Sequence, residues 1–183
     1  MSRPLHRARA FLHKRLALAR CVYLNRVWGM HIGEGSRISG KAFLDKANPA
    51  GVHIGAFTIV TPGVRVFTHD FVKGRNSDTR IGSNCFIGAD SIVMSGVTVG
   101  DHCIIAAGSI VTQDVPSRSI VAGNPARVVR SGINTGRYGT LPKQPTAPAQ
   151  TSPAEPERPS LIAEVVRPQA QLPETLSPIL TPE

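Results

Sequence analysis

An aliphatic residue returns every six positions through the middle of this chain. The period is interrupted twice, by four extra residues at 50–53 and by nine at 72–80. It matches neither the 3.6-residue period of an α-helix nor the two-residue period of a plain β-strand. Every member of the series is Ile, Leu or Val: Ile32, Ile38, Leu44, Ile54, Val60, Val66, Ile81, Ile87, Val93, Val99, Ile105 and Val111.

A six-residue repeat is typical of a β-solenoid. In such a fold each repeat supplies a short strand and a corner, and three repeats close one triangular coil. The aliphatic side chain points inward and stacks on its equivalent in the next coil, about 4.8 Å away along the axis. We therefore predict an all-β solenoid of about four coils over residues 32–49, 54–71, 81–98 and 99–116, from which both interruptions leave as loops.

Small residues accompany the aliphatic series. The residue after each aliphatic is Gly or Ala in many repeats, and we expect these positions to form tight corners in which Gly supplies a positive φ. Cys85 and Cys103 lie one coil apart in this register, and we interpret them as small buried hydrophobes. The chain has three cysteines, so one would stay unpaired, and a disulfide is not expected. The small positions are Gly33, Gly55, Gly82, Gly88, Gly100 and Ala106.

The N-terminal segment, residues 1–30, is predicted to form a basic amphipathic helix. Residues 3–26 carry seven Lys or Arg, and the first acidic residue is Glu34. The helix can cap the open first coil, because solenoid ends need capping, or it can contact an anionic membrane surface; the two roles can coexist. The apolar positions recur at helical spacing: Leu5, Ala8, Leu12, Leu16, Ala19 and Tyr23.

Beyond the solenoid, the composition changes. Ten of the fifteen prolines lie between Pro142 and Pro182, so residues 131–183 are predicted to be a Pro-rich, disordered tail. No uncharged apolar run approaches the length of a membrane span, and the charges near the N-terminus argue against a cleaved secretory signal. We expect a cytoplasmic protein, peripheral at the inner membrane surface if the helix binds lipid. The net charge of +9 comes largely from that helix, so no nucleic-acid partner is expected.

Two motifs join the repeats, the turn at 66–70 (VFTHD) and the closing run at 120–130 (IVAGNPARVVR). Over about residues 31–130 the three features together resemble the left-handed β-helix acyltransferases, in particular the sugar O-acetyltransferases of the maltose/galactoside and polysaccharide-biosynthesis type. The resemblance implies left-handed coils, an exception to the usual right-handed crossover. It also implies a homotrimer with active sites between subunits, acetyl-coenzyme A as acyl donor, and a sugar-type acceptor.

His69 is the predicted catalytic base. It follows Val66 by three positions, at a corner beside the second interruption, and an imidazole is suited to taking a proton from an acceptor hydroxyl near neutral pH. Asp70 is the candidate to orient the imidazole, although neighbouring residues of a strand point in opposite directions. The predicted reaction is direct acetyl transfer from the thioester to the hydroxyl, with no metal.

The remaining site residues follow from the resemblance. It assigns the donor site to backbone at two alanines, a threonine and two basic side chains near the coenzyme phosphates: Ala89, Ala107, Thr112, Arg127 and Arg130. Acceptor binding is expected from the stretch 45–49 of the neighbouring coil and from the loop 73–80, at Asn48, Lys73 and Arg75. Asn48 precedes a proline, so a turn-forming role stays an alternative.

Other functions stay open at this point. N-acetyl transfer to an amino sugar uses the same chemistry, and a non-catalytic β-helix scaffold is compatible with the Pro-rich tail. A zinc protein of the γ-type carbonic anhydrase kind would need three histidines, for which His53, His69 and His102 are available. A serine acetyltransferase is not expected, because that type carries a large helical domain ahead of its coils.

Overall fold

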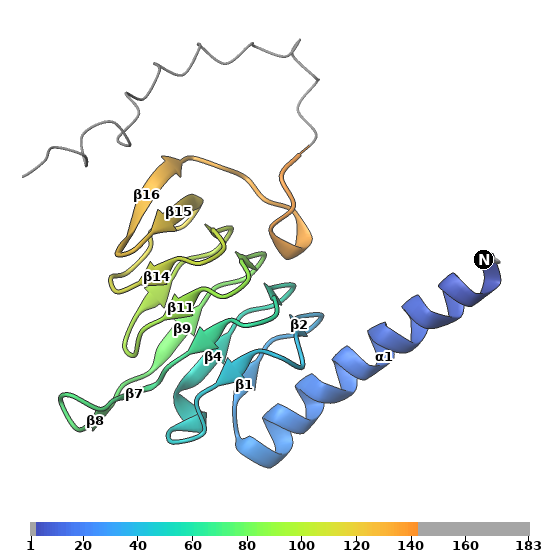
Figure 1. Cartoon of the computed structure of the whole chain (residues 1–183), viewed down its shortest axis with the longest axis horizontal. Coiled ribbons are helices and arrows are strands. Elements are labelled where there is room, and N and C mark those ends of the chain that lie inside the picture. Colours follow the sequence, from blue (N-terminus) through green and yellow to red (C-terminus); the bar gives the residue numbers. More distant parts are fainter. Residues whose placement is uncertain (1–2, 143–183) are drawn as a thin grey trace, which may run out of the picture. The chain divides into compact units, whose positions relative to one another are not determined.

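The structure is a computed structural model that describes residues 3–142, with side chains from residue 15 onward. A long helix precedes a prism built of three parallel sheets (Figure 1). The predicted Pro-rich tail after residue 142 lies outside the described residues. No helix in the described part of the chain is long and apolar enough to cross a membrane.

Each coil contributes one short strand to each face of the prism, called here sheets A, B and C. Sheet A contains β1 (His31–Ile32), β4 (Val52–Ile54), β9 (Thr79–Ile81) and β12 (Thr98–Val99). Sheet B contains β2 (Arg37–Ile38), β5 (Ile59–Val60), β10 (Phe86–Ile87), β13 (Ile104–Ile105), β15 (Ser119–Gly123) and β16 (Ala126–Ser131). Sheet C contains β3 (Phe43–Leu44), β6 (Arg65–Val66), β11 (Ile92–Val93) and β14 (Ile110–Val111).

The core confirms the six-residue register. Ile32, Ile54 and Ile81 pair in sequence across sheet A, and the equivalent positions align in the other two sheets. All twelve aliphatic residues of the series are buried. The three cysteines are buried and free, and the Cys103 N–H donates to the Cys85 Sγ at 3.4 Å, so these two residues are packed core thiols.

The explanation predicted for the glycines was wrong. Gly33, Gly55, Gly82, Gly88 and Gly100 do not have positive φ. A Cβ at each of them would instead lie within 3.0 Å of the backbone of the next coil. These residues are therefore small because successive coils approach too closely for a side chain.

The left-handed residues occupy a different place, three positions after the aliphatic. At the corner between sheets A and B this residue has a positive φ in every coil, and only one of them is glycine: Gly35, Phe57, Asn84, His102 and Arg118.

The corner between sheets C and A is irregular. The η1 turn (Pro49–Gly51) and the hairpin of β7 (His69–Asp70) and β8 (Arg75–Asn76) both leave the prism there, so the two interruptions of the sequence lie at one corner in adjacent coils.

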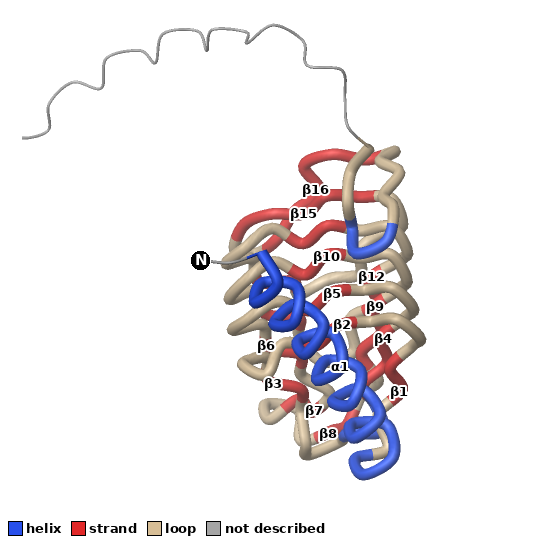
Figure 2. The backbone as a smooth tube through the Cα atoms, turned by 90° about the vertical axis from the view of Figure 1, so that its right-hand side faces the viewer, coloured by secondary structure: helices blue, strands red, loops and turns tan. Residues whose placement is uncertain are grey.

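Helix α1 (Arg3–Trp28) lies against the first coil (Figure 2). Cys21 and Leu24 are buried on the prism, and Trp28 packs beside them. Asn25 continues sheet A in place of a strand: its Nδ2 donates to the Ile32 carbonyl, its Oδ1 accepts from the Ile32 N–H, and both distances are 2.9 Å. The helix therefore caps the first coil.

Part of the predicted tail is ordered on the prism. After the antiparallel β15–β16 hairpin closes the last coil, residues 133–140, including η2 (Arg137–Gly139), run back along the corner between sheets A and B. The Ile133 N–H donates to the Arg118 carbonyl at 3.0 Å, and the Tyr138 hydroxyl donates to the Gly35 carbonyl at 3.0 Å. This strap joins the last coil to the first.

The close approach of the coils gives a matched pair of substitutions. Gly55→Ala places a Cβ about 2.6 Å from the Gly82 carbonyl carbon and should lower the free energy of unfolding by about 1–3 kcal/mol, the usual cost of overpacking. Gly40→Ala meets nothing within 4 Å and should leave stability unchanged or raise it by up to about 1 kcal/mol. Urea unfolding of both variants measures the difference; equal stabilities would contradict this account of the glycines.

Candidate functional site

The corner between sheets C and A brings His69 beside the first interruption. His69 begins β7 directly after coil two leaves sheet C, and Asp45 to Gly51 fill the same corner in coil one. His69 occupies a position that is left-handed at many other corners, but its own φ is not positive. The chain extends outward here as a hairpin instead of turning into sheet A.

Asp45 fixes the backbone that carries His69. Its carboxylate is only 4% exposed, and its Oδ2 accepts the N–H groups of Thr68 and His69, both at 3.0 Å. Its Oδ1 accepts the N–H of Ala47 at 2.9 Å. A charged acceptor shared by three backbone donors makes strong hydrogen bonds, so this one residue ties the His69 turn to the coil beneath it.

Three further side chains strengthen the same turn. The Asn48 Nδ2 donates to the Thr68 carbonyl at 3.3 Å, and the Thr68 hydroxyl donates to the Asn48 carbonyl at 2.7 Å. From the following coil, the Thr79 hydroxyl donates to the Phe67 carbonyl at 2.6 Å. The Asn48 amide nitrogen is therefore used within the protein, which supports the turn-forming alternative for Asn48 over sugar binding by its amide N–H.

The His69 imidazole has one unsatisfied nitrogen. Within the described residues its Nδ1 is buried and has no hydrogen-bond partner. The ring stands edge-on to the Phe71 ring, with 4.3 Å between centroids and 87° between planes. A buried imidazole nitrogen normally has a hydrogen-bond partner, and the described residues supply none for this atom.

Asp70 does not provide that partner. Its Oδ1 accepts the N–H groups of Val72 and Lys73, both at 3.0 Å, and its Oδ2 lies 3.6 Å from the Lys73 ammonium. The hydrogen bond from the Lys73 N–H lowers the pKa of the Asp70 carboxyl below its ordinary value. The carboxylate thus shapes the hairpin, and no bond in the described chain joins it to the imidazole.

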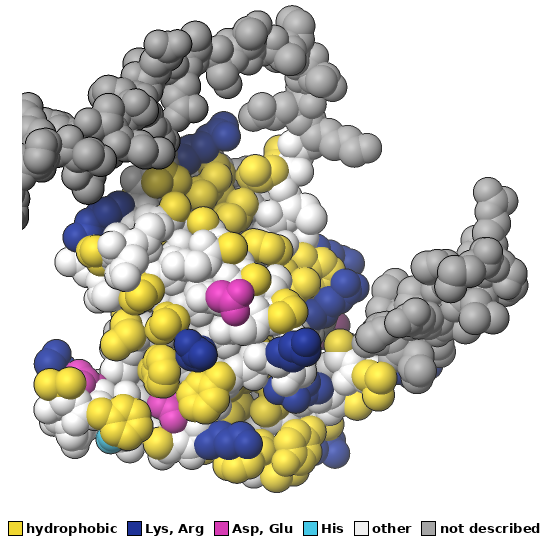
Figure 3. Space-filling view, viewed as in Figure 1, with side chains coloured by type: hydrophobic (Ala, Val, Ile, Leu, Met, Phe, Trp, Pro, Cys, Tyr) yellow, Lys and Arg dark blue, Asp and Glu magenta, His cyan; other side chains and the backbone are white. Residues whose placement is uncertain are grey.

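The hairpin tip is exposed. Lys73 and Arg75, predicted to bind the acceptor, both lie on it with exposed side chains. Phe71 and Val72 are 76% and 96% exposed, an unusual state for apolar residues beside a catalytic candidate. In Figure 3, hydrophobic side chains cover much of the described face, and acidic ones are few.

The predicted donor residues lie elsewhere on the prism. Ala89 and Ala107 stack at the corner between sheets B and C, where the Gly108 N–H donates to the Ala89 carbonyl at 2.8 Å. Arg127 and Arg130 are exposed on β16. Thr112 follows β14 at the other edge of sheet C, on the His69 side. One chain therefore places His69 and the two alanines at opposite edges of sheet C.

Two of the three histidines named for a zinc site have other partners. The His53 Nε2 lies 3.1 Å from the Asp78 carboxylate, and the His102 Nδ1 lies 2.8 Å from the Thr135 carbonyl. Among the described residues, no group of three or more His, Cys, Asp or Glu side chains is placed to hold a metal ion.

Comparison with known proteins places these features in a family. The family described as the hexapeptide repeat of succinyl-transferase matches residues 78–113. Protein CapG of Staphylococcus aureus is 42% identical over 117 residues, which span 58% of this chain and 68% of CapG. Serine acetyltransferase 2 of Arabidopsis thaliana is 34% identical over 122 residues, which span 64% of this chain and 37% of that protein.

A solved structure supports the fold. A hexapeptide-repeat-containing acetyltransferase from Vibrio cholerae matches 63% of this chain and 80% of its own, with 23% identity and a TM-score of 0.50. The same Vibrio protein complexed with acetyl-coenzyme A matches 62% of this chain and 76% of its own, with 23% identity and a TM-score of 0.46. The prism is a left-handed parallel β-helix, and the chain belongs to the hexapeptide-repeat acetyltransferase family.

Proposed function

We propose that this protein transfers an acetyl group from acetyl-coenzyme A to a hydroxyl of a sugar or polysaccharide precursor, with His69 as general base. The observation that carries the proposal is the fixed turn at the corner between sheets C and A. There Asp45 and Asn48 hold the backbone around a histidine whose Nδ1 is buried and has no hydrogen-bond partner among the described residues. A rigidly held imidazole beside an exposed hairpin is suited to proton transfer with a bound acceptor.

The proposed reaction is a single displacement. The acceptor hydroxyl proton passes to His69, and the hydroxyl oxygen attacks the carbonyl carbon of the thioester. The negative charge that develops on the carbonyl oxygen needs a hydrogen-bond donor. The carbon–sulfur bond then breaks, and the imidazolium returns its proton to the departing sulfur. We assign the base to Nε2, because Nδ1 is the nitrogen buried against the protein.

We propose further that the active protein is a homotrimer. His69 and the alanines at 89 and 107 lie at opposite edges of sheet C, so the donor edge of one copy must meet the His69 edge of another. The outer face of sheet C supports such a contact, because Phe43 and Met94 are 45% and 41% exposed there. The neighbouring copy would also supply the missing partner of the His69 Nδ1.

Removal of the imidazole tests the chemistry. His69→Ala should lower kcat by about 10²–10⁴ while the protein stays folded, because general-base assistance contributes roughly that factor. The measurement is thiol release from acetyl-coenzyme A in the presence of sugars, nucleotide sugars, amino sugars and L-serine. His31→Gln, an exposed histidine on β1, is the control and should keep full activity.

The same panel decides the acceptor class. Transfer to hydroxyl sugars supports the proposal. Transfer to amino sugars alone would favour N-acetylation, and transfer to L-serine alone would favour the activity named for the Arabidopsis relative. Undiminished activity of His69→Ala would overturn the assignment of the base.

Asp45 should act as a positioning residue. Asp45→Asn places an amide NH₂ where a carboxylate oxygen now accepts backbone N–H groups. The turn should shift, and kcat should fall about 10–100-fold, since small displacements of a catalytic group carry such costs. The KM for acetyl-coenzyme A should stay within about twofold, because the predicted donor alanines, Ala89 and Ala107, lie at another corner.

A second carboxylate provides the control for Asp45. Asp101 accepts the Ser83 N–H at 2.6 Å on a different corner. Asp101→Asn should lower thermal stability without lowering kcat of the folded protein. If both substitutions lower kcat equally, Asp45 acts through general stability and not through His69.

Mixing two inactive variants tests the shared site. His69→Ala removes the proposed base from one edge of sheet C. Ala107→Trp should block the proposed donor site at the other edge, because Ala107 is exposed and an indole fits only on the outside of the prism. Neither variant alone should be active. After unfolding and refolding together, mixed trimers should recover part of the activity, because some interfaces combine two intact edges. No recovery from mixtures that form trimers would contradict a site between copies.

A further inference from the structure

Three apolar residues on one side of the N-terminal helix are exposed, and two of them, Leu16 and Tyr23, belong to the predicted apolar stripe. Leu16, Tyr23 and Val27 are 58%, 51% and 64% exposed. Their spacing of seven and four residues puts them on one side of the helix. The residues that pack on the first coil, Cys21 and Leu24, lie on another side. The cap therefore leaves an unpartnered apolar surface on α1.

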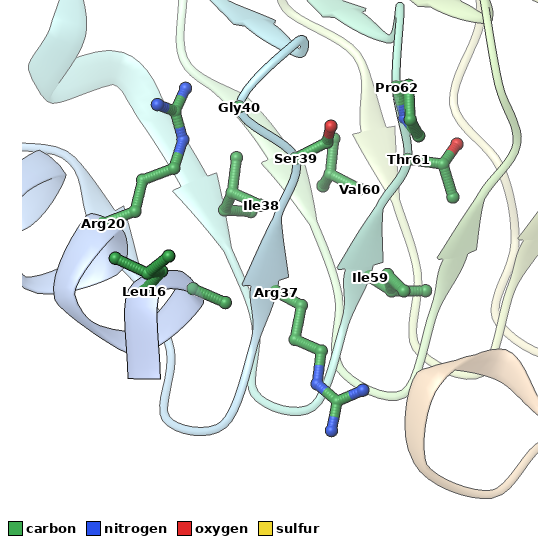
Figure 4. A pocket seen from close by; sticks show the side chains of 11 residues that line it. Leu16, Arg20, Arg37, Ile38, Ser39, Gly40, Ile59, Val60, Thr61 and Pro62 are labelled. Atoms are coloured by element: carbon green, nitrogen blue, oxygen red, sulfur yellow. The ribbon is translucent and has the colours of Figure 1, made fainter. Parts of the chain in front are cut away.

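A groove runs beside this stripe, between α1 and sheet B (Figure 4). Its volume is about 450 Å³. Leu16 and Arg20 line the helix side, and Ile38, Ile59 and Pro62 line the prism side. In the described residues, the Arg20 Nε is buried and has no hydrogen-bond partner. An apolar channel with an unsatisfied guanidinium nitrogen fits a ligand with an apolar chain and an anionic group.

The charge of the helix points to the same kind of ligand. Residues 3–26 contain seven Lys or Arg and no acidic residue. Helices that lie in a membrane interface combine basic residues with exposed apolar and aromatic ones, and Tyr is favoured at that depth. Charge complementarity thus selects an anionic partner, and the apolar stripe selects one with hydrocarbon at its surface.

We propose that α1 and the groove beside it bind the surface of an anionic phospholipid bilayer. Leu16, Tyr23 and Val27 enter the boundary between headgroups and acyl chains. The Arg20 guanidinium pairs with a lipid phosphate at the mouth of the groove. The attachment is peripheral, and the proposal does not rest on the proposed acetyl transfer, because it is argued from the exposed side of α1, whose main packing is on β1 and β2.

Vesicle sedimentation of the full chain tests the proposal. The protein should pellet with vesicles of phosphatidylcholine mixed with phosphatidylglycerol and stay in solution with phosphatidylcholine alone. The triple variant Leu16→Asn, Tyr23→Asn, Val27→Asn should bind at least about tenfold more weakly, because binding scales with buried apolar area. Arg20→Gln should weaken binding about fivefold, the effect of roughly one cationic side chain at a charged surface.

Controls come from the other end of the prism. Val129→Asn removes a residue of β16 that is 62% exposed, and Arg118→Gln removes an exposed cation; neither should change vesicle binding. Circular dichroism checks that each variant is folded, and sedimentation velocity measures its association state. Absence of binding to the anionic vesicles, or equal binding by the triple variant, would overturn the proposal. So would a triple variant that loses self-association, since a second copy would then cover the stripe.

Discussion

The spacing between coils governs this structure. Each strand bonds to its equivalent one coil away, and the inward aliphatics stack along the same direction. At about 4.8 Å between strands, the backbones of successive coils leave no room for a Cβ after the aliphatic in much of the prism, which is why Gly55 and Gly88 are glycines. Coils stacked this closely have no room for an extra residue within a strand, so an inserted segment must leave the prism at a corner.

That property explains where the candidate site lies. Both insertions leave through the corner between sheets C and A, in adjacent coils, and residues 45–48 before the first insertion hold the turn before the second. The Asp45 carboxylate accepts three backbone N–H groups, one from Ala47 in its own coil and two from Thr68 and His69 in the next coil. The regular coils thus provide a rigid base, and the irregular corner uses that base to hold one histidine at the edge of a projecting hairpin.

The sequence was sufficient for the coils, because a six-residue aliphatic period has one simple structural solution and all twelve positions obey it. It was insufficient for contacts between residues far apart in the chain. The strap could not be foreseen, since Tyr138 binds Gly35 across the whole prism through one hydroxyl and no local pattern encodes this bond. Asp45 had a detectable signal, an acid directly after the inward Leu44, but its partners depend on how two insertions stack. Asp70 was expected to orient His69, and hairpin closure engages its carboxylate instead.

A rigid prism also limits what one chain can do alone. Sheet C separates the His69 corner from the alanine corner by the full width of one face, and a hydrogen-bonded coil cannot bend to bring them together. Two observations on the His69 side agree with the proposed second copy at this edge: the imidazole Nδ1 has no partner in the part of the chain that the structure describes, and Phe71 and Val72 are exposed. In the proposed trimer, assembly would complete the site and remove apolar surface from water in one step, as closure of a flexible lid does in other enzymes.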